Sequence, residues 1–243
     1  MKKICIVGLG NMGQPLFEML KVKFEVSTCT REDDINKKLE NCEAFIIAVK
    51  PQNFGELAAN IRIDLSEKMA ISIMAGISIA KLQELLKMKK VVRTLPNLPV
   101  KVGEALTIWK ASEEFCDREF LQDLLWCVGD EIELKDEEDI EKIGAICGCG
   151  PAYFAYLGEK MAKLSLEFGL SEKDANKIAK QNLIGTSELV KDSGWSLTEL
   201  RERVTSKGGV TAAAIKSFEE NGFEEVFNKG IEAAIKRTKE LNG

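Results

Sequence analysis

The sequence predicts an α/β protein in which a parallel sheet domain precedes an all-helical domain. In the first half of the 243 residues, short strand-like segments alternate with helix-like segments, which is typical of a parallel sheet covered by helices on both faces. A glycine-rich turn directly follows the first of these strands. After about Asp136, strand patterns disappear and apolar residues recur with helical periodicity almost to the C-terminus. We therefore expect a Rossmann-type domain over residues 1–138 and a helical domain over residues 139–243.

Short apolar runs that end at glycine, proline or polar residues define the expected strands. The first run, KICIV, ends at Gly8, and the third, AFIIAV, is stopped by Pro51. The expected strands are residues 3–7, 24–29, 44–49, 69–74 and 90–95, with 104–110 and 131–134 as candidates to extend the sheet at one side. The expected helices between them are residues 13–21, 33–40 and 79–87, the first with an apolar stripe of Leu16, Phe17, Met19 and Leu20.

The C-terminal domain is expected to consist of helices alone. One apolar stripe runs along residues 151–168, formed by Phe154, Leu157, Met161, Leu164 and Phe168. Gly169 stops this helix, and Ser171 with Asp174 begins the next one as an acidic variant of the capping box. Further helices are expected over residues 198–204, 208–220 and 223–239. A few helices bury their apolar faces poorly alone, so we expect a homodimer or a higher oligomer built through them.

The overall charge argues against a nucleic-acid-binding protein. The formal net charge is −5 and the sequence pI is about 5.2, whereas a nucleic-acid binder usually shows basic clustering. The apolar run at the N-terminus is too short for a signal peptide or a membrane span. We therefore expect a cytoplasmic protein that acts neither on nucleic acid nor at a membrane.

No metal site is expected. The chain has no histidine, the commonest metal ligand and acid–base group at neutral pH. Its seven cysteines are scattered, which indicates neither a disulfide framework nor a zinc site. Cys147 and Cys149 form a Cys-x-Cys pair, but no third ligand is apparent. The chemistry must therefore rely on a cofactor, hydroxyls, carboxylates, lysines or thiols.

Residues 8–13 carry the pattern G-x-G-x-x-G between a strand and a helix. In this pattern Gly8 permits a tight turn, Gly10 lets the backbone approach a pyrophosphate, and Gly13 lets the helix pack closely on the strand. The helix N-terminus then presents unpaired N–H groups to the phosphates. The segment is therefore predicted to bind a dinucleotide through Gly8, Leu9, Gly10, Asn11, Met12 and Gly13. The alternative is a glycine-rich turn without a ligand.

The end of the second strand predicts which nicotinamide cofactor binds. An NAD enzyme usually places Asp or Glu there to accept a hydrogen bond from the ribose 2′-OH. Here the strand ends in Thr30 and Arg31, whose hydroxyl and guanidinium donors suit a 2′-phosphate. NADPH is therefore favoured. NADH stays possible, because a shift of one residue would place Glu32 at the ribose.

Three later segments are unusual for a generic protein of this fold. The first, RTLPNLP at 93–99, follows the fifth strand, where open parallel sheets bind ligands, so Asn97 is expected near the nicotinamide. The second, CGCGPAY at 147–153, places glycines in a helical region at a cost that indicates close packing or a ligand. The third, VTSKGGVT at 204–211, begins a helix with free N–H groups flanked by hydroxyls, which suit an anion.

These segments, in this order after the glycine pattern, resemble the pyrroline-5-carboxylate reductase family over essentially the whole chain. Ala48-Val49-Lys50-Pro51 is also similar to the family's A-V-K-P and joins the expected cofactor-binding residues. The resemblance implies an NADP-binding Rossmann domain and a helical dimerisation and substrate domain. It further implies an oxidoreductase that acts on a C=N bond. The implied reaction is NADPH-dependent reduction of 1-pyrroline-5-carboxylate to L-proline, the last step of proline biosynthesis.

Residue by residue, the resemblance assigns roles to the third segment. Ser206 and Thr211 are the candidate catalytic residues, Thr211 lying close to the ring nitrogen as a hydrogen-bond donor. The substrate-binding set is Ser206, Gly208, Gly209, Val210, Thr211 and Asn97. Asn36 is similar to an asparagine that the family uses near the cofactor ribose. The alternative for Ser206 and Thr211 is simple helix capping.

The chain departs from the family's pattern at a few positions. Lys207 stands beside the anion cradle where proline is usual, Cys147 and Cys149 replace serines, and Leu95 replaces methionine. Two rival functions therefore stay open. One is reduction of another cyclic imine or of an oxo acid, with Lys50 as the catalytic ammonium. The other is a catalytically dead, nucleotide-sensing homologue, against which the intact Ser206 and Thr211 argue.

Overall fold

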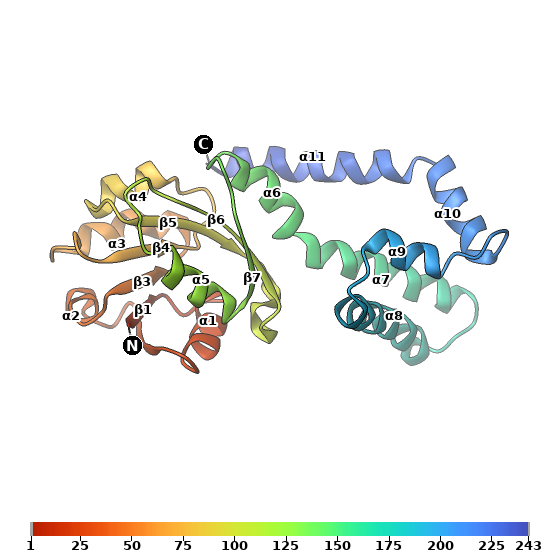
Figure 1. The fold of residues 1–243 in the computed structure, drawn as a ribbon, viewed down its shortest axis with the longest axis horizontal. Helices are drawn as coiled ribbons and strands as arrows, with labels where there is room; N and C mark the ends of the chain where they lie inside the picture. Colours follow the sequence, from red (N-terminus) through yellow and green to blue (C-terminus); the bar gives the residue numbers. More distant parts are fainter. Residues whose placement is uncertain (1, 243) are drawn as a thin grey trace. The chain divides into compact units, whose positions relative to one another are not determined.

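The computed structural model describes residues 2–242 and divides them into two compact units (Figure 1). The first unit contains the residues up to Pro151 together with those from Ala234 onward, and the second is Ala152–Ala233.

A seven-stranded sheet with the strand order β2-β1-β3-β4-β5-β6-β7 forms the first unit. Its strands are β1 (Lys3–Val7), β2 (Glu25–Cys29), β3 (Ala44–Ile47), β4 (Met69–Ser72), β5 (Val91–Pro96), β6 (Ala105–Ala111) and β7 (Gly129–Glu133). Neighbouring strands are parallel except β5 and β6. Only the short 3-10 helix η2 (Leu98–Val102) joins this pair, and a parallel pair needs a longer crossover. The predicted α/β class and Rossmann-type arrangement are thus confirmed, with one antiparallel pair.

Helices cover both faces of the sheet and bury a separate core on each. On one face, α1 (Gly13–Leu20) and α5 (Arg118–Trp126) contribute Leu16, Leu20 and Leu121. On the other face, α2 (Ile35–Glu40), α3 (Phe54–Asn60) and α4 (Ile79–Leu86) contribute Leu39, Phe54 and Leu82. The sequence did not predict α3 and α5, although both place apolar side chains on the sheet.

The helix α6 (Asp139–Cys147) packs against the sheet of the first unit. Gly144 allows this close packing, because a Cβ at that position would lie 2.5 Å from the side chain of Leu95 on β5. The contacts therefore group α6 with the sheet, whereas the boundary expected at residues 138 and 139 falls before it. As a division between cofactor-binding and substrate domains, that boundary stays a prediction.

The second unit consists of helices, two of which continue into the first unit. The helices are α7 (Gly150–Glu167), α8 (Glu172–Ser193), α9 (Leu197–Arg203), α10 (Val210–Glu220) and α11 (Phe223–Asn242). Ser171 caps α8 as expected and accepts a hydrogen bond from the N–H of Asp174. The Asp174 carboxylate accepts from the Ser171 hydroxyl at 2.7 Å. A reciprocal capping box forms at the start of α9, between Ser196 and Glu199.

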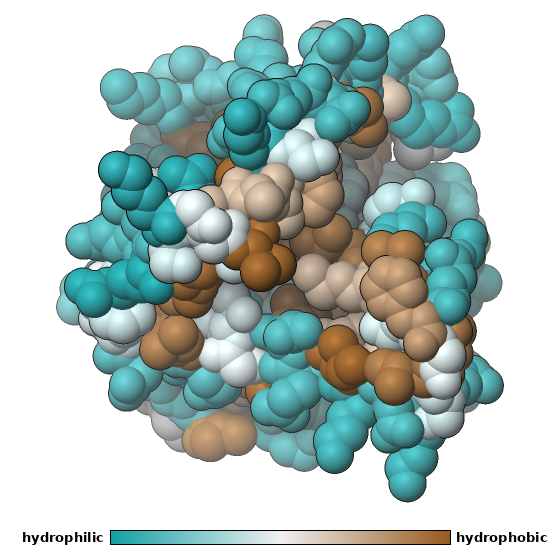
Figure 2. Space-filling view, turned by 90° about the vertical axis from the view of Figure 1, so that its right-hand side faces the viewer, coloured by the Kyte–Doolittle hydropathy of each residue, from teal (hydrophilic) through white to brown (hydrophobic). Residues whose placement is uncertain are grey.

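Apolar side chains of the second unit are largely exposed. Among the described residues from Ala152 to Ala233, the buried hydrophobic ones are Ala175 and Leu200. The predicted stripe on α7 is open, with Leu157 46% exposed and Phe154 61% exposed. Figure 2 shows apolar side chains gathered between hydrophilic rims on this side of the molecule. Within residues 2–242, no helix is both long enough and apolar enough to cross a membrane.

Candidate functional site

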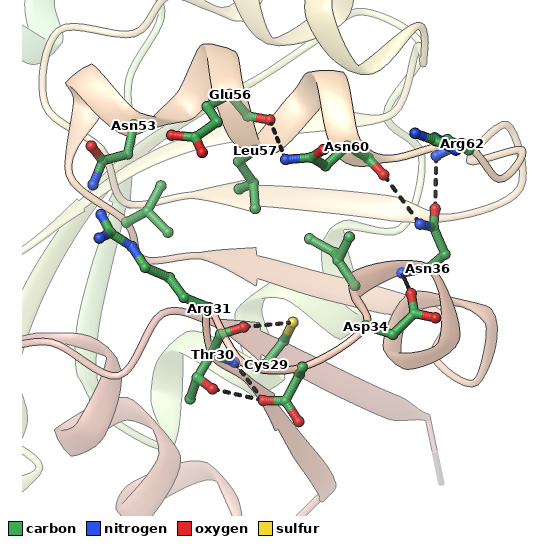
Figure 3. Close-up of a pocket in the computed structure, with 13 residues that line it drawn as sticks. Cys29, Thr30, Arg31, Asp34, Asn36, Asn53, Glu56, Leu57, Asn60 and Arg62 are labelled. Atoms are coloured by element: carbon green, nitrogen blue, oxygen red, sulfur yellow. Dashed lines mark hydrogen bonds between the residues drawn. The ribbon is translucent and has the colours of Figure 1, made fainter.

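Two adjoining clefts lie at the carboxyl ends of β1, β2 and β3, where a Rossmann-type sheet binds its ligand. The first cleft, of about 470 Å³, extends from the end of β2 to α2 and α3 (Figure 3). The second cleft, of about 570 Å³, is lined by the glycine turn and by the segment after β3. Of the predicted cofactor-binding residues, the clefts bring together Gly8, Leu9, Gly10, Thr30, Arg31, Asn36, Ala48, Val49 and Lys50.

The three glycines of the turn differ in what requires them. Gly8 has a φ of +99°, and an added Cβ would lie 2.8 Å from the carbonyl oxygen of Ala48. A Cβ on Gly13 would lie 1.9 Å from the carbonyl oxygen of Gly8, so α1 could not approach the turn. At Gly10 no atom lies within 4 Å of the added Cβ. The fold therefore requires Gly8 and Gly13, while Gly10 faces open space that a pyrophosphate can approach.

The remaining predicted residues of this region do not line the clefts. Asn11 is exposed, and Met12 packs against the core below α1. Gly13 is buried, and Pro51 begins the 3-10 helix η1 (Pro51–Asn53). The N-terminus of α1 has no side-chain cap, which leaves its first N–H groups available to an anion. The roles predicted for these residues stay predictions.

The end of β2 carries a dense set of polar contacts. Asp33 accepts hydrogen bonds from the N–H of Thr30 at 2.8 Å and from its hydroxyl at 2.9 Å. The pKa of Asp33 is lowered, first by these bonds and then by Lys38, whose ammonium lies 3.3 Å away. The guanidinium of Arg31 faces the cleft (Figure 3) and has no hydrogen-bond partner among the described residues.

Asn36 joins α2 to the chain that follows α3. Its amide N–H donates to the carbonyl of Asn60 at 3.1 Å, and its side-chain oxygen accepts from the N–H of Arg62 at 2.7 Å. Asp34 caps α2 by accepting from the N–H of Asn36. Asn36 therefore shapes the wall of the cleft, and its predicted contact with a ribose is untested by these bonds.

Cys29 lines both clefts without adding charge to them. Burial raises the pKa of this thiol to about 11, and the nearby Cys5 and Asp33 act in the same direction. At neutral pH the side chain is therefore neutral, and it does not repel a phosphate.

A third cavity, of about 270 Å³, lies within the first unit between the end of β5 and α6. Pro96 and Cys149 line this cavity, but Asn97 does not. Its amide donates to the carbonyl of Cys147 at 3.1 Å and accepts from the N–H of Leu106 at 2.9 Å. These bonds give Asn97 a structural role, and substrate contact stays a prediction.

Cys147 and Cys149 are free, and no group of three possible metal ligands occurs in the described part of the chain.

The predicted anion cradle lies in the second unit, at the start of α10. Gly208 has a φ of +73°, and the N-cap Gly209 provides no side-chain cap to the helix. The Ser206 hydroxyl lies over this helix start, since a Cβ on Gly209 would be 2.3 Å from its oxygen. The hydroxyl of Thr211 has no hydrogen-bond partner among residues 2–242. Neither hydroxyl caps α10, which removes the simplest structural reading of both residues.

Sequence reasoning missed several residues that line the first cleft. They are Asp33, Asp34, Asn53, Glu56, Leu57, Asn60 and Arg62. Most belong to α3 or its ends, which were not predicted as a helix. The spacing of Asn53 and Leu57, four residues apart after Pro51, was the available signal for one helix face toward the clefts.

Comparisons with known proteins all lead to one family. A family model described as pyrroline-5-carboxylate reductase dimerisation matches residues 137–241. The pyrroline-5-carboxylate reductase of Haemophilus influenzae is 32% identical over 255 residues, covering 99% of this chain and 94% of the relative. That of Pseudomonas aeruginosa is 32% identical over 263 residues, covering 98% and 96%.

Solved structures of pyrroline carboxylate reductases are also similar to this chain. The pyrroline carboxylate reductase of Plasmodium falciparum, solved with NADP bound, has a TM-score of 0.83 at 27% identity and covers 100% of this chain and 98% of that one. A pyrroline-5-carboxylate reductase from Coxiella burnetii has a TM-score of 0.88 at 26% identity, covering 100% and 99%.

Proposed function

The chain belongs to the pyrroline-5-carboxylate reductase family, and from this premise we infer that it reduces 1-pyrroline-5-carboxylate to L-proline. It is an oxidoreductase that acts on a C=N bond with NADPH or NADH, at the last step of proline biosynthesis. The observation that carries this inference is 32% identity to a named reductase along 94% of its length. The cleft residues support the same cofactor: the uncapped α1, the open space at Gly10 and the guanidinium of Arg31 suit a dinucleotide.

Different residues bind the dinucleotide, bind the substrate and assist the reaction at the ring nitrogen. When bound, the dinucleotide supplies a hydride to the imine carbon, and the protein supplies orientation and charge. Gly8 permits the tight turn, and Gly10 would let the backbone approach the pyrophosphate. The start of α10, with Ser206, holds the substrate carboxylate on free N–H groups. Thr211 would donate a hydrogen bond to the nitrogen of the neutral imine and pass its proton to that nitrogen as the hydride adds to carbon. The ring then gains one hydride and one proton, the hydroxyl regains its proton from water, and no histidine is required.

Following reduced-cofactor oxidation at its own absorbance tests this function, with pyrroline-5-carboxylate as substrate and NADPH and NADH run in parallel. Imine-dependent oxidation supports it. Oxidation only with a different cyclic imine would show that this other imine is the substrate. Oxidation only with an oxo acid would favour Lys50 as the catalytic ammonium instead. Tight binding without turnover of any of these would favour a nucleotide sensor.

Replacing Thr211 with alanine should lower kcat/KM for pyrroline-5-carboxylate by about tenfold, which corresponds to about 1.4 kcal/mol, the loss of one hydrogen bond to a developing charge. Thr211→Ser keeps the hydroxyl and should retain most of the activity. Steady-state kinetics with saturating cofactor measure both variants. An unchanged kcat/KM in Thr211→Ala would show that Thr211 does not assist the ring nitrogen.

The exposed apolar helices support a homodimer through the second unit. The dimerisation family model covers this unit, and the residues of the α7 stripe are between 41% and 82% exposed. Leu164→Glu should shift the protein toward monomer, because it places a charge in the apolar stripe, where Leu164 is 51% exposed. Light scattering measures the mass. Val22→Glu, at an 84% exposed position of the first unit, is the control and should leave the mass unchanged.

The same proposal covers the partners and the compartment. Its ligands are the dinucleotide, a cyclic imine carboxylate and a second copy of the chain, without nucleic acid or membrane. A cytoplasmic location is consistent with seven cysteines that are all free in the structure.

A further inference from the structure

Asp33 occupies the end of the first cleft where the ribose of the dinucleotide is expected. It lies four residues beyond the end of β2 and lines the cleft beside Thr30 and Arg31. One carboxylate oxygen, Oδ2, accepts from both the N–H and the hydroxyl of Thr30. Both hydrogen-bond donors of Thr30, including the hydroxyl predicted to suit a 2′-phosphate, are therefore already used within the chain (Figure 3).

The charge at this position works against a phosphate as well. Thr30 and Lys38 stabilise the ionised form of Asp33, so the carboxylate is negative at neutral pH. A phosphate monoester carries a charge between about −1.5 and −2 at pH 7, and it would lie next to this carboxylate. A ribose 2′-OH is neutral and can donate a hydrogen bond to the same oxygens, as acidic residues near this position do in NAD enzymes.

Positive groups in the cleft offset this effect only in part. Arg31 faces the cleft without a partner among the described residues, and Arg62 lines its far side. The ammonium of Lys38 is paired with Asp33 itself. The cleft therefore combines cations that attract a 2′-phosphate with one carboxylate that competes for its donors.

We propose that Asp33 is a specificity-determining residue of this cleft, which reduces the preference for NADPH over NADH. It does so by holding the donors of Thr30 and by placing a negative charge beside the ribose 2′ position. This inference rests on the proposed assignment of the clefts to the dinucleotide.

The dissociation constants of NADPH and NADH test the proposal without any turnover, from titrations that follow the fluorescence of the reduced nicotinamide. Asp33→Asn removes the charge with little change of shape, and Asp33→Ser removes both charge and length. In each variant the ratio of NADH to NADPH dissociation constants should rise by about tenfold, the size expected for one charge-assisted contact.

A matched control exists in the same unit. Asp64 also accepts from the N–H and the hydroxyl of one neighbouring residue, Ser66, at 2.9 Å on Oδ1 and 3.0 Å on Oδ2, but it does not line the two dinucleotide clefts. Asp64→Asn should therefore leave the ratio unchanged. A ratio within twofold of the native protein in both Asp33 variants, with an unchanged circular dichroism spectrum, would overturn the role of Asp33. Absence of binding of either dinucleotide by the native protein would overturn it too.

Turnover separates this inference from the proposed reaction. If the ratio of dissociation constants shifts but pyrroline-5-carboxylate is not reduced with either cofactor, Asp33 sets cofactor choice and the assigned reaction is wrong. If the imine is reduced and the ratio of kcat/KM values for the two cofactors does not respond to Asp33→Asn or Asp33→Ser, the reaction stands and the role of Asp33 is wrong.

Discussion

Arg93→Ala should lower the free energy of unfolding by about 3–5 kcal/mol, the usual cost of removing one partner from a buried ion pair. The side chain of Arg93, on β5, is only 6% exposed. Its guanidinium contacts Glu137 at 3.1 Å and Glu141 at 2.5 Å. Without it, two partly buried carboxylates lose this cation. Among the described residues, Glu137 keeps the bond from the N–H of Ile79, at 2.8 Å.

Denaturation in urea, followed by circular dichroism, measures this effect. Lys142→Ala, on the helix α6 that carries Glu141, is the control. The side chains of the Lys142–Asp139 ion pair are 55% and 40% exposed, so this pair should contribute less than about 1 kcal/mol. Combining Arg93→Met with Glu137→Gln and Glu141→Gln removes the whole charge cluster and should recover much of the loss. A loss below about 1 kcal/mol in Arg93→Ala would show that water or local rearrangement satisfies the two carboxylates.

The Arg93 cluster also shows where sequence reasoning ends. The segment 93–99, at the end of β5, was recognised as unusual, but Arg93 bonds to residues 44 and 48 positions further along the chain. No periodicity encodes such a pair, because it depends on where α6 packs. The glycine pattern, in contrast, acts within six residues, and its turn, strand and helix were predictable from those residues alone.

The candidate site was likewise predictable only where its features are local in the sequence. The glycine-rich helix start at Gly208 and Gly209 was predictable, because a positive φ and an uncapped helix start are local properties, while its role as an anion cradle stays a prediction. The occupation of the Thr30 donors was not predicted, although Asp33 is only three residues away. The pattern showed which donors exist there, and only the geometry showed that a carboxylate already uses them. The strand β6 was expected over residues 104–110, but its antiparallel direction escaped prediction, because a strand pattern does not encode direction.

Gly13→Ala is expected to destabilise the protein by about 3 kcal/mol or more and to abolish dinucleotide binding. The added Cβ would lie 1.9 Å from the carbonyl oxygen of Gly8, and backbone cannot give way there without moving α1 or the turn. Both movements displace the helix N-terminus that is predicted to bind the pyrophosphate. Urea denaturation and a fluorescence titration with NADPH measure the two effects separately.

Gly10→Ala separates the requirement of the fold from that of the ligand. Nothing lies within 4 Å of the added Cβ and the backbone is not left-handed, so stability should stay within about 1 kcal/mol of the native value or rise slightly. The same methyl group would point into the space where the pyrophosphate approaches, and affinity for NADPH should fall at least about tenfold. Unchanged affinity in Gly10→Ala would mean that the open space at Gly10 is not the pyrophosphate site. Loss of binding in Gly13→Ala would then report only the damaged fold, so the pair of variants decides whether the glycine turn binds a ligand.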